Sequence, residues 1–148
     1  MEFALALPML LVVIAGIVDF GFVFQRYEVI TNAAREGARL ASLPEYTDDA
    51  LVKARVRSYV QNGLSLSTSA LDSVLPLSSV TVAHDTFPVP MPVGPDENID
   101  TATVTVSYQH NFMLLGPLLS LINGSWGGPI TLTSSSQMRL ESQAGAGS

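Results

Sequence analysis

EFALALPMLLVVIAGIVDFGFVF, residues 2–24, is the stretch that decides the fold. Between Phe3 and Phe24 the single charged residue is Asp19, and Glu2 lies just before the apolar run. At about 1.5 Å of rise per residue, an α-helix of about 22 residues spans about 30 Å, the thickness of a bilayer's hydrocarbon core. We therefore expect residues 1–24 to form a hydrophobic helix long enough to cross a membrane.

The composition excludes several classes of protein. The chain has 148 residues, of which 47% are hydrophobic and 14% charged, with a net charge of -6 and no cysteine. Most cations precede residue 60, which leaves no basic groove for nucleic acid. The lack of cysteine excludes disulfides, a thiolate nucleophile and a zinc knuckle. One small domain with one hydrophobic helix fits this length.

The helix is expected to continue as an amphipathic segment over residues 25–43 and to end before Pro44. Pro8 lies inside it and is expected to kink or loosen it, because proline removes one backbone hydrogen bond. Charged residues occupy the other faces of the second half, while small apolar residues recur near helical spacing at Ile30, Ala34, Gly37, Ala38 and Ala41.

A second helix is expected to follow. Thr47 is the expected N-cap, and Asp48 and Asp49 suit the positive end of the helix dipole. Gly63 is a natural end to the helix. Its predicted apolar stripe is Val52, Val56, Tyr59 and Val60.

Beyond residue 64 the apolar period changes to two, which is typical of strands with one covered face. The three segments are SSVTVAHD (78–85), TATVTVSYQHNF (101–112) and PITLTSSSQMRLE (129–141). We expect loops at 86–100 and 112–129, and within the second loop the apolar residues 113–122 form either a short helix or an exposed patch. The fold class is thus α+β: a long N-terminal hydrophobic helix continues into a small head, residues 44–148, with a second helix and an antiparallel sheet of about three strands.

The two carboxylates of the apolar segment each allow two interpretations, because a carboxylate in hydrocarbon is costly unless it finds a partner. Glu2 either lies among lipid headgroups or, in a filament of staggered parallel helices, meets the positively charged N-terminus of another chain. Asp19 either lies at the far membrane interface or pairs with Arg26 of a neighbouring chain.

The first 42 residues closely resemble the N-terminal signature of the TadE-like family of the tight-adherence (Tad) pilus system. The resemblance lies in Glu2-Phe3-Ala4-Leu5, Pro8, Ile17-Val18-Asp19-Phe20-Gly21 and the segment Asn32-Ala33-Ala34-Arg35-Glu36-Gly37-Ala38-Arg39. Ile130–Thr133 and Met138-Arg139 resemble, more weakly, the last strand of such proteins.

The resemblance implies a type IV pilin-like subunit. It would lie in the inner membrane until a prepilin peptidase removes a short basic leader, and then enter an extracellular filament. Pilins generally carry the glutamate at the fifth mature position, whereas here it is second. The implied partners are other copies of the chain, other pilins and the assembly machinery, and the expected assembly residues are Met1, Glu2, Pro8, Asp19, Arg26, Arg35, Glu36 and Arg39.

Other candidate sites are weak, and we expect no catalytic residues, metal or cofactor. His84-Asp85 and His110 lack a nucleophile motif and are best interpreted as strand residues. The acidic loop with Asp96, Glu97 and Asp100 lacks EF-hand spacing, so it is more simply a solvated loop than a Ca²⁺ site. Asn123-Gly124-Ser125 fits a glycosylation pattern or a turn. Trp126, like the acidic loop, is a weak candidate for surface binding.

Two functional hypotheses from different classes remain. The first is a non-enzymatic structural subunit of a Tad-type pilus, polymerising through its N-terminal helix for adhesion, with a minor pilin that initiates or caps the filament as its variant. The second is a single-span membrane-anchored binding module that uses the Pro-rich and Gly-Trp loops. An anchored hydrolase has almost no support.

Overall fold

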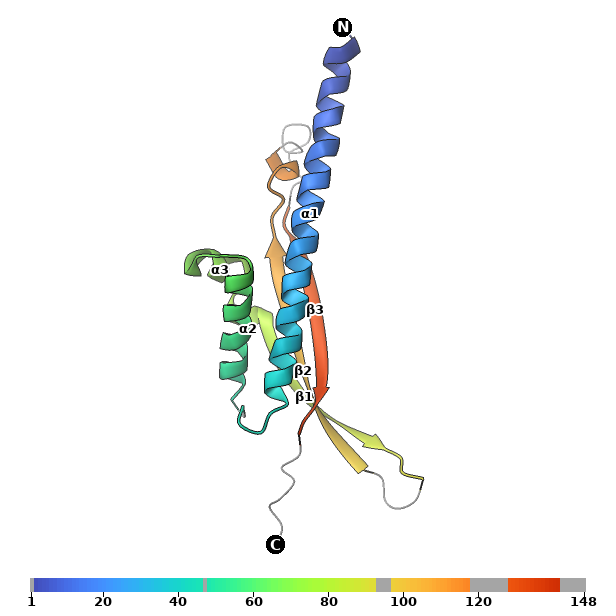
Figure 1. Ribbon diagram of the computed structural model, residues 1–148, viewed down its shortest axis with the longest axis vertical. Coiled ribbons are helices and arrows are strands. Elements are labelled where there is room, and N and C mark those ends of the chain that lie inside the picture. Colours follow the sequence, from blue (N-terminus) through green and yellow to red (C-terminus); the bar gives the residue numbers. More distant parts are fainter. Residues whose placement is uncertain (1, 47, 93–96, 118–127, 142–148) are drawn as a thin grey trace.

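The computed structural model describes residues 2–46, 48–92, 97–117 and 128–141, with the side chains of residues 6 onward. The elements are three α-helices, a 3-10 turn and three strands within this part of the chain. The chain is elongated, and its N-terminal helix projects beyond the head (Figure 1). The predicted α+β class is confirmed.

The first helix, α1 (Glu2–Ala41), is a single helix of 40 residues. It continues through Pro8, where a kink was expected, and Figure 1 draws it unbroken. It ends two residues before the predicted end at Leu43. The last turn is closed by bonds from the Ser42 N–H to the Ala38 carbonyl at 3.0 Å and from the Leu43 N–H to the Leu40 carbonyl at 3.1 Å.

The second helix, α2 (Asp49–Gly63), begins after a different cap from the one predicted. Asp48 is the N-cap, and its carboxylate accepts a bond from the Ala50 N–H at 2.9 Å. Thr47, the predicted cap, lies outside the described residues. Val52, Val56 and Val60 are buried as predicted, whereas Tyr59 is 39% exposed, so its place in the stripe was wrong. Gly63 ends the helix as expected.

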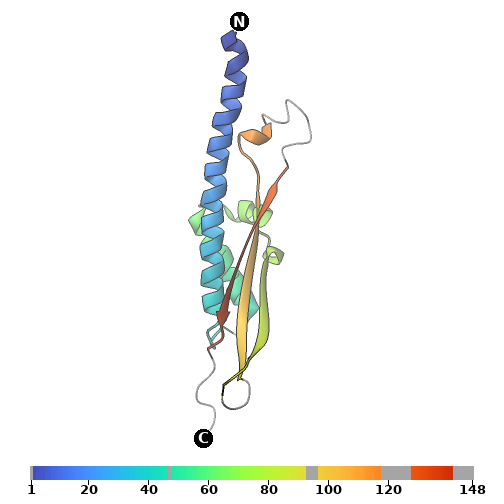
Figure 2. The ribbon, with the colours of Figure 1, turned by 90° about the vertical axis from the view of Figure 1, so that its right-hand side faces the viewer.

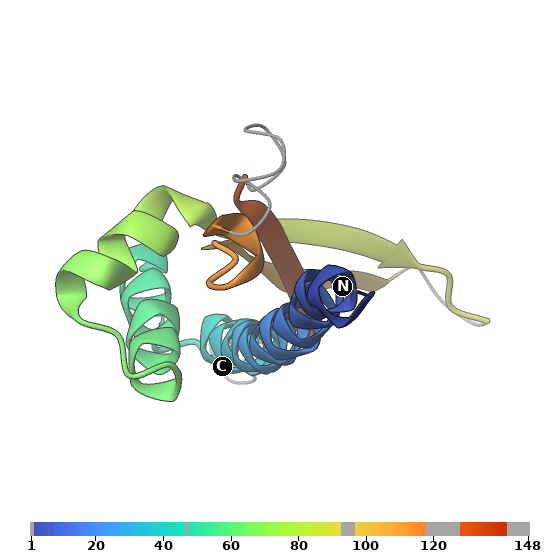
Figure 3. The same cartoon turned by 90° about the horizontal axis from the view of Figure 1, so that it is seen from above.

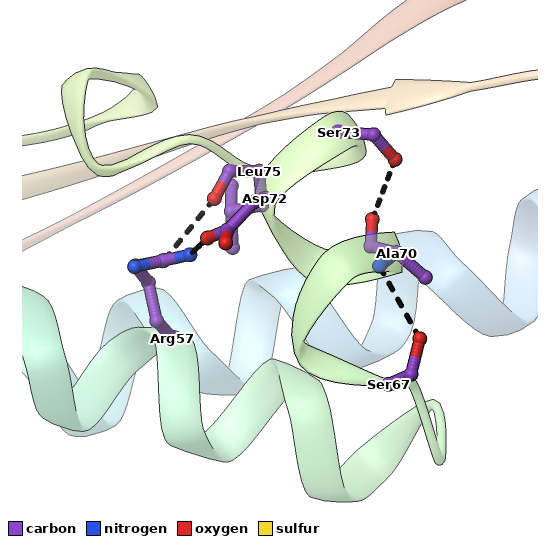
Figure 4. A network of polar contacts seen from close by, with 6 residues as sticks. All are labelled: Arg57, Ser67, Ala70, Asp72, Ser73 and Leu75. Carbon is purple, nitrogen blue, oxygen red and sulfur yellow. Dashed lines mark hydrogen bonds and ion pairs between the residues drawn. The ribbon is translucent and has the colours of Figure 1, made fainter.

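Two short elements were not predicted: α3 (Thr68–Val74) and the 3-10 turn η1 (Leu77–Ser79). Ser67 caps α3 by accepting a bond from the Ala70 N–H at 3.3 Å. Arg57 on α2 holds this segment, because it donates to the Leu75 carbonyl at 3.2 Å and pairs with Asp72 (Figure 4).

The sheet consists of β1 (Val80–Val89), β2 (Glu97–His110) and β3 (Ile130–Arg139), antiparallel in the order β1-β2-β3. In the register, Val80 pairs with Val106 and His110 with Ile130. The expectation of a loop over the whole of residues 86–100 was wrong, because residues 86–89 pair with 97–100. Pro88 is tolerated because β1 is an edge strand.

Both long helices cover the same face of the sheet, with α1 against β2 and β3 and α2 beside it near β1 (Figure 3). The period of two explains this face: alternate β2 residues from Ala102 to Tyr108 are buried. The predicted stripe of α1 is buried opposite them. Gly37 permits the close approach, because a Cβ there would lie 2.5 Å from Cγ2 of Val56 and 3.0 Å from Cγ1 of Val104. Among the described residues the shared core includes Ile30, Ala33, Ala34, Ala38, Ala41, Val52, Val56, Val60, Leu71, Leu75, Val80, Ala102, Val104, Val106 and Tyr108.

Candidate functional site

The N-terminal half of α1 is apolar and has little protein around it. We call residues 6–24 of this helix the apolar rod. The helix over Ala6–Ala41 is long and apolar enough to cross a membrane, and it is the single such helix in the described part of the chain. Its exposed side chains point in all directions around the helix: Leu7, Met9, Leu10, Leu11, Val13, Ile14, Ile17, Val18, Phe20, Phe22 and Phe24. Such a surface needs a lipid or protein partner.

The rest of the chain covers one side of α1 at Ala15, which is 5% exposed, and at Asp19, which has no exposed surface. The Asp19 carboxylate accepts hydrogen bonds from three successive backbone N–H groups. Met113 donates at 3.2 Å, Leu114 at 3.2 Å and 3.0 Å to the two oxygens, and Leu115 at 2.7 Å. Within this chain, therefore, the partners of the Asp19 carboxylate are backbone N–H groups of a distant segment, a contact that neither interpretation of Asp19 included.

The donors belong to the segment that follows β2, residues 112–115, which we call the β2–β3 corner. A short helical turn at residues 115–117 starts here, so Asp19 acts as its N-terminal cap from a distant part of the chain. Figure 2 shows the turn beside the upper half of α1. The rest of the apolar segment predicted at 113–122 lies outside the described residues from 118 onward.

A second contact joins α1 to the end of β2. Nη1 of Arg26 hydrogen-bonds Nδ1 of His110, and the Arg26 guanidinium lies 5.9 Å from the centre of the Phe22 ring. Because arginine can only donate, Nδ1 accepts and Nε2 carries the proton. His110 is 1% exposed, its Nε2 has no hydrogen-bond partner among the described atoms, and its ring packs edge-on against Phe112 at 5.4 Å between centroids.

The charge state of His110 follows from this environment. Burial first, and then the Arg26 charge, lower the pKa of His110, while Asp19 acts in the opposite direction. Burial also raises the pKa of the nearby Tyr108 phenol. His110 is therefore neutral at pH 7, which suits its place beside a guanidinium.

The other expected assembly residues do not gather around this contact. Arg35 is exposed. Glu36 accepts two bonds from Arg39, at 3.0 Å and 3.1 Å, on the surface of α1. Pro8 lies in the free half of the helix, and Met1 and the Glu2 side chain lie outside the described part of the structure.

The candidate surface-binding residues are not brought together in the described part of the chain. Glu97 pairs with Arg139 at 3.1 Å, and Asp100 accepts a bond from the Thr86 hydroxyl at 2.6 Å. Asp96, Asn123 and Trp126 lie outside the described residues. No group of three histidine or acidic side chains that could hold a metal ion occurs among the described residues.

His84 and His110 lie in strands, as the sequence indicated. His84 on β1 faces Ala102 in the register, which is far along β2 from His110. Its partner is Asp49 on α2, at 3.1 Å, not the adjacent Asp85.

Sequence reasoning missed the role of His110 and of the corner backbone. For His110 a signal existed, because the period of two in β2 places it on the same face as Val106 and Tyr108, toward α1. For the corner no local pattern identifies backbone donors that bond a side chain 96 residues earlier.

Comparison with known proteins adds evidence for the N-terminal segment. Among curated proteins and solved structures, none matches the chain. Residues 1–39, which include the apolar rod, Asp19 and Arg26, match the model of the family described as TadE-like protein, and this match is consistent with a TadE-like protein of the Tad pilus system.

Proposed function

We propose that the protein is a structural subunit of an extracellular Tad-type pilus that polymerises through the N-terminal half of α1. The family suggests a Tad pilus-associated protein, and an N-terminal apolar helix fits anchoring in a membrane. In this proposal the subunit waits in the inner membrane, is processed by a prepilin peptidase, and is then passed by the assembly machinery into a filament that serves adhesion.

The observation that carries the proposal is the apolar rod itself. Met9, Ile17 and Phe24 are 74%, 68% and 71% exposed, although they span four turns of the helix. A bilayer covers such a surface before assembly. Parallel helices of other copies can replace the lipid in a filament, because packing between helices is as favourable for these side chains as contact with acyl chains.

The attachment of the rod to the head supports a structural role. The second half of α1 contributes Ile30, Ala34 and Ala38 to the core of the head, so rod and head form one continuous element. Bundling of the rods therefore places the heads on the outside at a defined distance from the filament axis. The TadE-like pilus-associated family is likewise structural rather than catalytic.

Photocrosslinking tests this proposal. A benzophenone amino acid replaces Ile17 or Met9 in the apolar rod, or Leu51 on α2 as the control, since Leu51 is also an exposed apolar residue at 54%. Filaments are sheared from cells, irradiated and separated by mass. We expect a ladder of crosslinked multimers from positions 9 and 17 and monomers from position 51.

The opposite result is equally clear. If all three variants stay in the membrane fraction and none enters sheared material, the chain is an anchored module or a minor subunit and not the polymer. If the sheared fraction contains the chain but crosslinks arise from position 51 alone, the filament is held by the heads, and the helix is not the polymerisation element.

A further inference from the structure

The apolar surface of α1 extends past the point at which the head begins. Phe20, Phe22 and Phe24 follow Asp19 and are 56%, 37% and 71% exposed. From Phe3 to Val18 the helix measures only about 24 Å, whereas Phe3 to Phe24 measures about 33 Å and matches the hydrocarbon core of about 30 Å. A bilayer that covers this helix therefore reaches the level of Asp19 and of the β2–β3 corner.

The corner is itself apolar at this level. Met113 and Leu114 are 64% and 41% exposed, and Phe112 is half-buried against His110. Next along α1, Arg26 and Tyr27 are the first residues suited to the headgroup region, where arginine and tyrosine commonly lie. The exposed side chains of the corner thus lie on the lipid side of that boundary.

Non-helical backbone can enter hydrocarbon only when its polar groups are satisfied by protein. Three N–H groups of the corner meet this condition, because those of Met113, Leu114 and Leu115 all donate to Asp19. The same bonds satisfy the carboxylate, which would otherwise be costly inside a membrane. The carboxylate and the three N–H groups therefore each offset the free-energy cost of placing the other in hydrocarbon.

We infer that the β2–β3 corner is a second membrane contact, inserted through Met113 and Leu114 into the leaflet on the side of the head, with Asp19 as the residue that positions it. The partner is the acyl region of a lipid bilayer. This inference rests on the membrane-anchored state in the proposed function and adds to it a fixed orientation of the head. The chain is then anchored both by α1 and by the inserted β2–β3 corner, so that the head cannot rotate freely about α1.

The lack of cysteine makes a direct test possible, since each single-cysteine variant carries one label site. Full-length Met113→Cys is spin-labelled and reconstituted into vesicles of phosphatidylethanolamine and phosphatidylglycerol. Collision rates with oxygen, which concentrates in lipid, and with a water-soluble nickel chelate give the depth of the label. Ile17→Cys in the rod is the control for lipid and Leu51→Cys on α2 is the control for water.

We expect the ratio of oxygen to nickel collisions at position 113 to exceed that at position 51 several-fold and to approach that at position 17. If position 17 is in lipid and position 113 gives the ratio of position 51, the inference is wrong and anchoring by α1 stands. If position 17 is also in water, the membrane-anchored state fails, and both proposals fail with it.

The role of Asp19 is tested in the Met113→Cys background. Asp19→Ala leaves three N–H groups without an acceptor, so the ratio at position 113 should fall toward that of position 51. Asp19→Asn keeps one acceptor oxygen and should lie between. Circular dichroism of the Asp19→Ala and Asp19→Asn variants verifies that the head is folded. A label that stays in lipid with Asp19→Ala overturns the positioning role.

Discussion

The carboxylate of Asp19 accepts a hydrogen bond of 2.7 Å from the backbone N–H of Leu115, 96 residues later in the chain. This bond and those from Met113 and Leu114 join the apolar rod to the head at the level above which the helix projects alone. Asp19 is thus a junction within one chain. Within the same chain Arg26 pairs with His110 and not with Asp19, which has no exposed surface.

Asp19→Ala should destabilise the junction. An unsatisfied buried N–H costs about 1 to 3 kcal/mol, so we expect a loss of at least about 2 kcal/mol when three donors lose their acceptor. The loss is checked by denaturant unfolding of the full chain in detergent micelles, with hydrogen exchange at residues 113–115 as the local measurement. Asp19→Asn is the matched control with a smaller loss. Equal exchange rates in the wild type and both variants would contradict the junction.

Gly37→Ala should destabilise the head although alanine favours helix. The new Cβ would lie 2.5 Å from Val56 Cγ2, and both this methyl and Val104 belong to the packed core. Overpacking costs about 1 to 3 kcal/mol, which exceeds the gain of about 1 kcal/mol in helix propensity. Gly21→Ala is the control, because a Cβ added at position 21 would have no atom within 4 Å. Thermal unfolding of both variants measures the contrast, and equal midpoints would show that α1 does not pack this closely.

Arg57→Ala should destabilise the α3 segment, and we expect loss of the hydrogen bond to the Leu75 carbonyl to contribute more than loss of the ion pair with Asp72. Asp72 is 60% exposed, and an exposed ion pair contributes about 0 to 1 kcal/mol. The bond from Arg57 Nε to the Leu75 carbonyl is partly buried, and its loss costs about 1 kcal/mol or more. We therefore expect Asp72→Ala to change the free energy of unfolding less than Arg57→Ala does. A double-mutant cycle checks this, and equal losses would assign the effect to the ion pair.

The junction should weaken in mild acid because of His110. Its pKa is lowered in the folded state. Below the ordinary value near 6.5, His110 is therefore protonated in the unfolded chain while it stays neutral in the folded chain. Stability is therefore complete above about pH 6.5 and falls as the pH drops toward the lowered pKa. His110→Gln should remove this dependence between pH 7 and 5. Unfolding of the two proteins across that interval is the measurement, and parallel curves would exclude His110 as the source.

Glu2→Ala should reduce the yield of sheared filaments and leave the head folded. The expected cause is loss of a charge-assisted contact with the positively charged N-terminus of a staggered neighbour. Glu2→Gln tests whether charge is needed, and circular dichroism of both variants reports on the head. Normal filament yield from Glu2→Ala would disprove the pairing.

The elements that repeat a local pattern could be predicted from the sequence. The apolar run and the small-residue stripe around Ala34 determine α1, and the valines at 52, 56 and 60 determine the buried face of α2. Three alternating segments determine the strands of the sheet. These patterns are local because helix and strand periodicity depend on neighbouring residues.

The tertiary structure decided which groups meet. Asp19 and Arg26 were visible as charges in or beside an apolar segment, but their partners lie far along the chain. The partner of Arg26 is the last residue of β2, and the partners of Asp19 follow shortly after that strand. The strands also include residues 86–89 and 97–100, where prolines indicated a loop, because these two segments pair with each other. Pro88 is tolerated there because β1 is an edge strand, where a missing N–H need not break a ladder bond. Hydrogen-bond partners far apart in the chain depend on packing of whole elements, and no local pattern encodes that distance.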